Sequence, residues 1–289
     1  MTPDRVVFSG LGGGLVERDT GSYDPARPAI AALARLGVPL VLCSSRPRSE
    51  VMLVSRLLGL GAPVIVENGA ALVVPDGHLR GGVPGGLWDG EFHVLTLGPP
   101  REALRAALDE VAAAARVEVR VPPAPEREHT VPFLVETEGD ATALAREAAA
   151  RGMRVLRGEA RWYLCGGADK GLATRMLLSL YEREGGVPRA IALGAWQVDL
   201  PMLRAAHRPV VLPRTVGGVE PRLAAELPHA EYAPRGGPGG WNDAVLAILA
   251  GRRLPTLGPD ARQRKSHSGG RLEARPRGGA PISGRAGAS

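Results

Sequence analysis

RVVFSGLGGGLV, residues 5–16, is an apolar strand pattern that runs straight into a cluster of glycines. Val6, Val7 and Phe8 form a short β-branched and aromatic run, which is typical of a buried strand. The glycines that follow let the backbone turn tightly or approach a ligand closely. This stretch therefore predicts a buried strand with a ligand-binding loop at its carboxyl end.

Further patterns of the same kind follow along the chain. Val38–Cys43 is nearly all apolar, as expected of a parallel strand covered on both faces, and Ala62–Val66 is a third strand pattern. Apolar residues at helical spacing lie between them, at Ala29–Leu36 and Arg48–Leu58. Strand, helix, strand, helix, strand predicts an α/β fold with a parallel sheet, in which ligands bind at the carboxyl ends of the strands.

A second unit is predicted in the middle of the chain, after a Gly- and Pro-rich stretch. Its pattern is β-α-β-β-α-β, an α+β unit inserted into the α/β domain, and Asp140 is its expected helix N-cap. The expected strands include Phe92–Leu97, Val117–Val121 and Thr130–Thr137, and the helices are Arg101–Ala115 and Asp140–Arg151. We therefore predict a core of residues 1–82 and 166–251, a cap of residues 83–165, and a tail of residues 252–289.

Composition restricts the classes of function. The 289 residues carry a net charge of +6, and much of the excess lies in the Gly-, Pro- and Arg-rich tail, which we predict to be disordered. The remainder is near neutral, so we predict no nucleic-acid partner. Two cysteines make neither a disulfide framework nor a zinc site. Because no apolar run is long enough to span a membrane, we predict a cytoplasmic protein without a membrane partner.

Four motifs, in this order, resemble those of the haloacid-dehalogenase-like (HAD) phosphatases, and within them the mannosyl-3-phosphoglycerate phosphatase family. The first motif of that superfamily reads D-x-D-G-T, and here the place reads Gly10-Leu11-Gly12-Gly13-Gly14. The second motif, a Ser or Thr that ends a strand, is matched by Ser44, and the third, a Lys, by Lys170. The fourth, G-D-S-x-N-D, reads Gly194-Ala195-Trp196-Gln197-Val198-Asp199, and Glu67-Asn68-Gly69 is also family-like. The resemblance implies a HAD-like Rossmannoid core with an inserted α+β cap.

The resemblance also implies a reaction, the Mg²⁺-dependent hydrolysis of a glycosyl-3-phosphoglycerate phosphomonoester. In the superfamily the first Asp attacks phosphorus, and the second protonates the leaving oxygen and later activates water. Magnesium bridges the nucleophile, a backbone carbonyl and an Asp of the fourth motif, while Ser or Thr and Lys hold the phosphoryl oxygens. In this chain Gly10 stands at the nucleophile position and Gly12 at the acid/base position.

The sequence therefore predicts a pseudophosphatase, because glycine supplies no nucleophile, proton or metal ligand from a side chain. Magnesium is expected from the family, but Ala195 and Val198 replace usual ligands and leave Asp199 as the residual one. Ser44, Ser45 and Lys170 are the predicted phosphate-binding residues. The predicted substrate contacts are Arg46, Glu67, Asn68 and Gly69.

Each retained residue also has a purely structural interpretation. Lys170 can be a solvated lysine at a helix start, and Ser44 and Ser45 can be helix N-caps. Asp199 precedes Leu200-Pro201, which is the pattern of an N-cap with Pro in the first turn. Glu67-Asn68-Gly69 can be a hairpin turn.

Two other functions fit parts of the sequence. Gly10-x-Gly12 after a strand, with Arg46 and Arg48 after the next strand, is a pattern of NADP-binding units, although the third glycine would fall at Leu15. The other is a non-catalytic protein that binds a phosphorylated sugar-glycerate or regulates a partner enzyme of glycosylglycerate metabolism. For such a regulator we expect a complex with the partner enzyme and no turnover of substrate.

Overall fold

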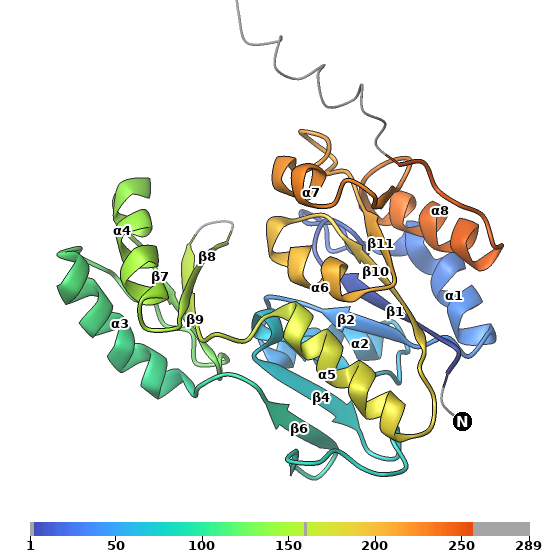
Figure 1. Ribbon diagram of the computed structural model, residues 1–289, viewed down its shortest axis with the longest axis horizontal. Helices are drawn as coiled ribbons and strands as arrows, with labels where there is room; N and C mark the ends of the chain where they lie inside the picture. Colours follow the sequence, from blue (N-terminus) through green and yellow to red (C-terminus); the bar gives the residue numbers. More distant parts are fainter. Residues whose placement is uncertain (1–2, 159–160, 257–289) are drawn as a thin grey trace, which may run out of the picture. The chain divides into compact units, whose positions relative to one another are not determined.

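The large sheet of the computed structural model has nine strands (Figure 1). The structure describes residues 3–158 and 161–256. In spatial order the strands are β12 (Glu231–Tyr232), β11 (Arg208–Val211), β10 (Arg189–Gly194), β1 (Arg5–Gly10), β2 (Leu40–Cys43), β3 (Val64–Val66), β4 (Ala71–Pro75), β6 (Phe92–Thr96) and β5 (Leu87–Trp88). All pairings from β12 to β3 are parallel, and those of β4, β6 and β5 are antiparallel. The predicted α/β fold with a parallel sheet is confirmed.

Helices cover both faces of this sheet, which explains why its central strands are apolar throughout. The helices are α1 (Arg27–Arg35), α2 (Arg48–Leu57), α5 (Lys170–Arg183), α6 (Leu200–Ala205), α7 (Pro221–Glu226) and α8 (Gly237–Leu249). Val7, Leu42 and Leu193 share one core cluster with Ile30 of α1 and Trp241 of α8. Because side chains alternate along a strand, the neighbouring buried residues of the same strands face the other side.

Two polar side chains of the late segment Gly239-Gly240-Trp241-Asn242 fix α8 to the rest of the core. The indole Nε1 of the fully buried Trp241 donates a hydrogen bond to Ser9 Oγ at 2.9 Å. Asn242 Oδ1 accepts from the backbone N–H of Ala29 at 3.0 Å, which satisfies an orphan donor in the first turn of α1. Each contact supplies a partner to a group that folding removes from water.

The described residues also form a separate three-stranded antiparallel sheet, with the order β7 (Thr130–Phe133), β9 (Trp162–Cys165) and β8 (Arg154–Arg157). Two helices, α3 (Arg101–Ala115) and α4 (Glu138–Ala149), accompany it. Its core is a separate cluster that includes Leu108, Phe133 and Leu164. This small α+β unit lies in the sequence between β6 and α5, within the predicted cap of residues 83–165 but with fewer strands than expected.

Two expected cap strands were wrong. The strand at Phe92–Leu97 forms as β6, but it pairs with β4 in the large sheet, because the Gly-rich stretch before it folds back as a hairpin. At Val117–Val121 the described chain holds a single bridge, from Arg120 to Leu134, in place of a strand. We therefore propose that the cap begins after β6, near Gly98, and not at residue 83.

The start of α4 also differs from the expectation. Its N-cap is Thr137, whose Oγ1 accepts from the backbone N–H of Asp140 at 3.1 Å. The carboxylate of Asp140 accepts in return from the Thr137 N–H at 3.0 Å, which completes a capping box. Asp140 is therefore the third residue of the helix, and the sequence pattern placed the cap three residues late.

The end of the described chain, residues 252–256, lies against the edge strand β12, where Tyr232 N–H donates to Pro255 O at 2.8 Å. The predicted disorder of the tail concerns residues 257–289, which lie outside the described residues.

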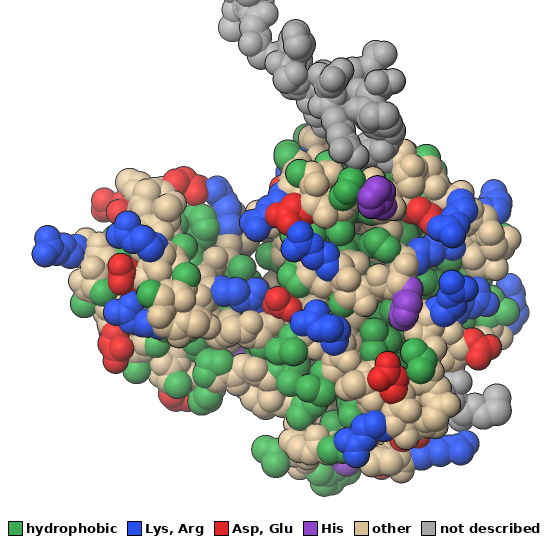
Figure 2. All heavy atoms as spheres, viewed as in Figure 1, with side chains coloured by type: hydrophobic (Ala, Val, Ile, Leu, Met, Phe, Trp, Pro, Cys, Tyr) green, Lys and Arg blue, Asp and Glu red, His purple; other side chains and the backbone are tan. Residues whose placement is uncertain are grey.

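In the part of the chain that the structure describes, every helix is too short or too polar to cross a membrane. Location in the cytoplasm stays a prediction. Figure 2 shows basic and acidic side chains interspersed over the face in view.

Candidate functional site

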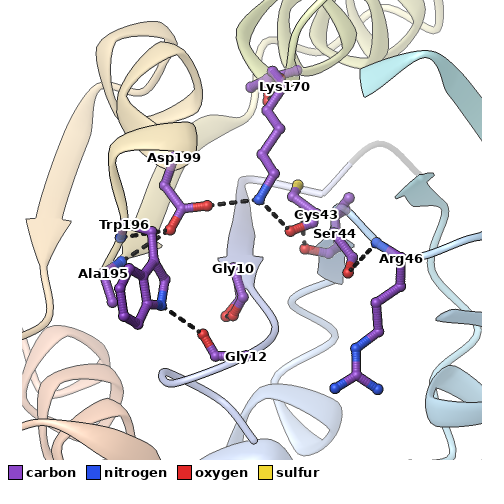
Figure 3. A network of polar contacts seen from close by, with 12 residues as sticks. Gly10, Gly12, Cys43, Ser44, Arg46, Lys170, Ala195, Trp196 and Asp199 are labelled. Atoms are coloured by element: carbon purple, nitrogen blue, oxygen red, sulfur yellow. Dashed lines mark hydrogen bonds and ion pairs between the residues drawn. The ribbon is translucent and has the colours of Figure 1, made fainter. Parts of the chain in front are cut away.

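Three adjacent strands end together at the candidate site. Because β10, β1 and β2 are parallel neighbours, Gly194, Gly10 and Ser44 lie together at the carboxyl ends of these strands. Figure 3 shows Gly10 and Ser44 in this place. Lys170, the first residue of α5, and Asp199, just before α6, complete the set. The structure thus brings together the residues that correspond to all four motifs.

Lys170 and Asp199 form a buried ion pair, with residue exposures of 3% and 2%. The ammonium Nζ donates to Asp199 Oδ1 at 2.7 Å and to the carbonyl oxygen of Cys43 at 3.0 Å. The interpretation of Lys170 as a solvated lysine is therefore wrong. A buried charge is stable only when it is paired and hydrogen-bonded, and here each charge depends on the other.

The second carboxylate oxygen of Asp199 is also occupied. Oδ2 accepts from the backbone N–H groups of Ala195 at 3.0 Å and Trp196 at 3.1 Å. Asp199 stands at the N-cap position of α6 with Pro in the first turn, as the pattern indicated, but its carboxylate makes no capping hydrogen bond to that turn. Gly194 permits this approach, since a Cβ there would lie 2.5 Å from the Cβ of Asp199.

The two glycines at the catalytic positions differ in the space around them. A Cβ at Gly10 would lie 3.1 Å from Asp199 Oδ2 and 3.2 Å from Oδ1, closer than most real Cβ contacts. Apart from its chain neighbours, no heavy atom of the described residues would lie within 4 Å of a Cβ at Gly12. The carboxylate of Asp199 therefore lies in tight contact with the place where a side chain at position 10 would begin, whereas the space beside Gly12 is open among the described residues.

The donor set at this site does not fit a magnesium ion. Mg²⁺ requires oxygen ligands in near-octahedral geometry and usually takes one or two carboxylates. Here Oδ1 of Asp199 is paired with an ammonium group and Oδ2 with two N–H donors, while Ala195 and Val198 have no side-chain oxygen. Among the described residues no cluster of three His, Cys, Asp or Glu side chains is suited to a metal.

Trp196 lies over the glycine loop, and sequence reasoning did not identify it. Its indole Nε1 donates to Gly12 O at 3.1 Å (Figure 3). The guanidinium carbons of Arg18 and Arg214 lie 4.4 and 5.6 Å from the centroid of its ring, within cation–π range. We call these three residues the Trp196 stack. The sequence signal was the indole in a motif where the family has a small polar residue.

Ser44 orders the loop that follows β2. Its hydroxyl oxygen accepts from Arg46 N–H at 3.1 Å, and the N-cap of α2 is Pro47, so neither Ser44 nor Ser45 caps this helix. Ser45 is exposed, and its carbonyl oxygen accepts from Arg127 at 3.1 Å. The side chain of Arg46 is about two-fifths exposed and forms an ion pair with Glu50 at 3.5 Å.

Glu67-Asn68-Gly69 connects the antiparallel strands β3 and β4, but it is more than a hairpin turn. All three residues have left-handed φ values, of 46°, 61° and 96°. The turn is held by hydrogen bonds from Glu67 N–H to Arg46 O at 3.1 Å and from Asn68 N–H to Ser44 O at 2.9 Å. Within the described chain Asn68 Oδ1 is buried and accepts no hydrogen bond. Such strain and such an unsatisfied acceptor are features of binding sites.

Glu67 links this turn to residues 127–130, which precede and begin β7 of the cap. Its buried carboxylate accepts from Glu128 N–H at 2.7 Å, from His129 N–H at 3.3 Å and from the Thr130 hydroxyl. Arg127 lies 3.7 Å from the same carboxylate and stacks on the ring of Tyr163 at 4.5 Å. The structure therefore adds Arg127, which the sequence analysis missed because only the fold brings it to the strand ends.

Cys43, which ends β2 and whose carbonyl oxygen accepts from Lys170, brings a thiol to the site. Burial raises the pKa of its thiol to about 12, with a smaller upward effect from Asp199 that Lys170 opposes. Burial raises the pKa of Cys165 to about 12 in the same way. Because the thiolate is the reactive form, both thiols are unreactive at neutral pH.

The dinucleotide alternative does not agree with the fold. In dinucleotide-binding units a helix begins at the glycine loop and directs its N-terminus at the pyrophosphate. Here turns follow Gly10, and the next α-helix begins at Arg27. The NADP-binding interpretation is therefore wrong.

Comparison with solved structures shows the fold. A Thermoplasma acidophilum protein, 0175, superposes with a TM-score of 0.68 at 18% identity, covering 86% of this chain and 99% of that one. A HAD subclass IIB sugar phosphatase gives 0.59 at 16% identity, with 85% and 98% covered. The sucrose-phosphatase of Synechocystis sp., solved with sucrose and phosphate, gives 0.60 at 14% identity, with 86% and 98% covered.

Comparison of sequences shows the family, although no family model matches the chain. A Methanococcoides burtonii protein named glucosyl-3-phosphoglycerate/mannosyl-3-phosphoglycerate phosphatase is 30% identical over 267 residues, which cover 85% of this chain and 97% of that one. A Persephonella marina protein of the same name is 30% identical over 264 residues, with 84% and 97% covered. The mannosyl-3-phosphoglycerate phosphatase of Pyrococcus furiosus is 32% identical over 219 residues, with 68% and 86% covered. With the motif positions gathered at one sheet edge, these matches show that the chain belongs to the mannosyl-3-phosphoglycerate phosphatase family of the HAD superfamily.

Proposed function

We propose that this chain is a catalytically inactive member of its family that binds a phosphorylated sugar-glycerate without hydrolysing it. One observation carries the proposal. Glycines stand at both catalytic carboxylate positions, and the remaining carboxylate, that of Asp199, is buried and paired with Lys170 and two N–H donors. A carboxylate in that state neither attacks phosphorus nor activates water.

Neither the Cys43 thiol nor the Ser44 hydroxyl is suited to replace the missing nucleophile. The Cys43 thiol is buried and protonated, and the Ser44 hydroxyl accepts from Arg46 N–H, with no described histidine or carboxylate bonded to it as a base. An unactivated hydroxyl is a weak nucleophile at its ordinary pKa. Loss of the nucleophile in a covalent mechanism leaves only the contribution of binding and electrostatics.

The groups that bind a ligand persist beside the missing catalytic ones. Ser44, Arg46 and the unsatisfied acceptor Asn68 Oδ1 lie around one loop, and Arg127 of the cap reaches the same loop. Guanidinium groups suit the phosphate and carboxylate of a phosphoglycerate, and an amide acceptor suits a sugar or glycerate hydroxyl. The names of the relatives supply the ligand class, mannosyl- or glucosyl-3-phosphoglycerate.

The test is phosphate release from mannosyl-3-phosphoglycerate and glucosyl-3-phosphoglycerate with MgCl₂, together with calorimetric titration of the same compounds. We expect binding, with no release above the background of a Lys170→Ala variant. Release that Lys170→Ala abolishes contradicts the loss of activity, whereas no heat with either compound contradicts the ligand assignment.

A revertant provides the positive control for this assay. The variant Gly10→Asp, Gly12→Asp, Ala195→Asp, Val198→Asn restores the polar residues of the first and fourth motifs, and we expect it to release phosphate in a Mg²⁺-dependent manner. The structure adds one condition, which is that the Asp199 side chain must move away from position 10. An inactive but folded revertant that binds Mg²⁺ contradicts the assignment of these positions.

A further inference from the structure

The Trp196 stack joins three loops that follow neighbouring strands. Arg18 follows the glycine loop after β1, Trp196 follows β10, and Arg214 follows β11, and these strands are adjacent in the order β11-β10-β1. Two cationic side chains thus converge on one aromatic ring at the end of the sheet where ligands bind.

The stack is fixed to the glycine loop. The indole is oriented by its hydrogen bond to Gly12 O, at 3.1 Å. Gly13, with a left-handed φ of 75°, leaves the room for it, because a Cβ there would lie 3.0 Å from Trp196 Nε1 and 3.5 Å from Arg18 Cδ. The loop that has lost its carboxylates therefore supports an indole and an arginine side chain.

Relative to the family motifs, the site has lost negative charge. Gly10, Gly12 and Ala195 replace three carboxylates of the family motifs, and the charge of Asp199 is matched by Lys170. The guanidinium of Arg214 donates to the carbonyl oxygens of Gly217 and Gly218, both at 3.4 Å, and no carboxylate of the described chain forms an ion pair with it. Its positive charge is therefore not neutralised by an acidic side chain.

Guanidinium groups can supply positive charge to a phosphate without a metal ion. Arginine stays charged at any pH a protein tolerates, and its planar set of N–H donors matches phosphate oxygens in pairs. The space beside Gly12, where a Cβ would meet no heavy atom within 4 Å, lies next to the carbonyl group that anchors the indole. An anion placed there lies beside the Trp196 stack.

We propose that this site binds its phosphomonoester without magnesium, and that Arg18 and Arg214, held on the indole of Trp196, take the place of the metal as the source of positive charge. The proposal rests on the proposed function, since it names how the same ligand is held. The residual Lys170–Asp199 pair then serves to keep the strand ends in position.

The experiment is calorimetric titration of the full chain with mannosyl-3-phosphoglycerate and with inorganic phosphate, in buffer with EDTA and in buffer with MgCl₂. The variants are Arg214→Gln, Trp196→Ala and Arg18→Gln. Arg222→Gln is the matched control, because Arg222 is an exposed arginine of α7 whose ion pair is with Glu226. Thermal melting of each variant reports whether it is folded.

We expect equal affinity with EDTA and with MgCl₂, and affinity weakened about tenfold or more in folded Arg214→Gln and Trp196→Ala, as for loss of a charge-assisted hydrogen bond. Arg222→Gln should bind as the unmodified chain does. Binding that requires MgCl₂, or that is unchanged in Arg18→Gln and Arg214→Gln, overturns this inference and leaves the ligand assignment intact. Absence of binding in both buffers overturns the two together.

Discussion

Asp199 shows how one side chain changes role when its neighbours change. With no side chain at position 10, its carboxylate lies against the backbone of β1 and forms a buried pair with Lys170. The motif pattern correctly located Asp199 and Lys170 at the site, yet it favoured a helix cap for Asp199. Sequence spacing could not predict which groups the Asp199 carboxylate contacts, because those contacts depend on the space that Gly10 and Gly194 leave in the folded chain.

The two catalytic-position glycines should respond differently to substitution. Gly12→Asp extends into open space, so we expect a stability within about 0.5 kcal/mol of the unmodified chain. Gly10→Asp places a second carboxylate in contact with Asp199, and we expect a loss of about 1–3 kcal/mol, as for overpacking of a tight site. Urea unfolding measures both, and adding Asp199→Asn to Gly10→Asp should recover part of the loss. Equal stabilities for the two single variants would show that the Asp199 side chain is free to move.

Cys43 and Cys165 should resist alkylation in the folded protein. Burial raises the pKa of both thiols to about 12, so the thiolate fraction at neutral pH is negligible. We expect iodoacetamide at pH 7.5 to label neither residue in native buffer and both in denaturant, as read by peptide mass spectrometry. Rapid native labelling of Cys43 would reopen the search for a nucleophile at the end of β2.

At the scale of elements, the sequence predicted β1, α1, β2, α2 and β3 of the α/β core with small shifts, because each carries an apolar pattern. The prediction failed where the local sequence pattern does not determine which strand or side chain a residue contacts. The strand β6 looks like any alternating strand, and only its hairpin with β5 and its register with β4 place it in the large sheet. Arg127 and the Trp196 stack were missed for the same reason, since their partners are remote in sequence.

A substitution at Glu67 should weaken the contact between the turn Glu67–Gly69 and the cap while the α/β core stays folded. Glu67→Gln weakens the contacts to Glu128 N–H and the Thr130 hydroxyl, and we expect faster hydrogen exchange in residues 127–133, with exchange of β1 and β2 unchanged. The expected cost is about 1–3 kcal/mol, as for a buried group that loses its partners.

Glu128→Gln is the control for that measurement, because Glu128 contributes its backbone N–H to the link while its side chain is exposed. It should exchange like the unmodified chain. Equal exchange in both variants would mean that the cap is held by its other contacts, such as the hydrogen bond from Arg127 to Ser45 O.

For the whole molecule, the end of the described chain protects an edge of the large sheet. Glu231 on β12 accepts from Arg208 at 2.7 and 3.0 Å, from Arg253 at 3.3 Å and from Leu254 N–H at 2.7 Å. These contacts hold residues 252–256 along the strand, and the backbone bond from Tyr232 to Pro255 O extends the pairing. An edge strand covered in this way is a poor template for aggregation.

This edge should make stability dependent on pH. Burial alone would raise the pKa of Glu231, but its hydrogen bonds with Arg208 and Leu254 N–H hold that pKa below the ordinary value. A carboxylate whose pKa is lower in the folded state stabilises the fold above its unfolded pKa, about 4.3, and loses this effect as the pH falls through its folded pKa.

We therefore expect the melting temperature to fall less between pH 7 and pH 3.5 in Glu231→Gln than in the unmodified chain, although it should start lower at pH 7. Glu226→Gln is the comparison, because Glu226 forms ion pairs with Arg204 and Arg222 on the surface. Exposed pairs contribute little, so its pH profile should follow that of the unmodified chain. Parallel profiles for all three proteins would remove Glu231 as a source of the pH dependence.

The position of Asp199 against Gly10 also has a consequence for descent. A lineage can regain the carboxylate at position 12 in a single step, because the space beside Gly12 stays open. A carboxylate at position 10 would meet the Asp199 side chain in close contact, so its return costs stability unless that side chain shifts. Reversal is therefore harder at the nucleophile position than at the acid/base position.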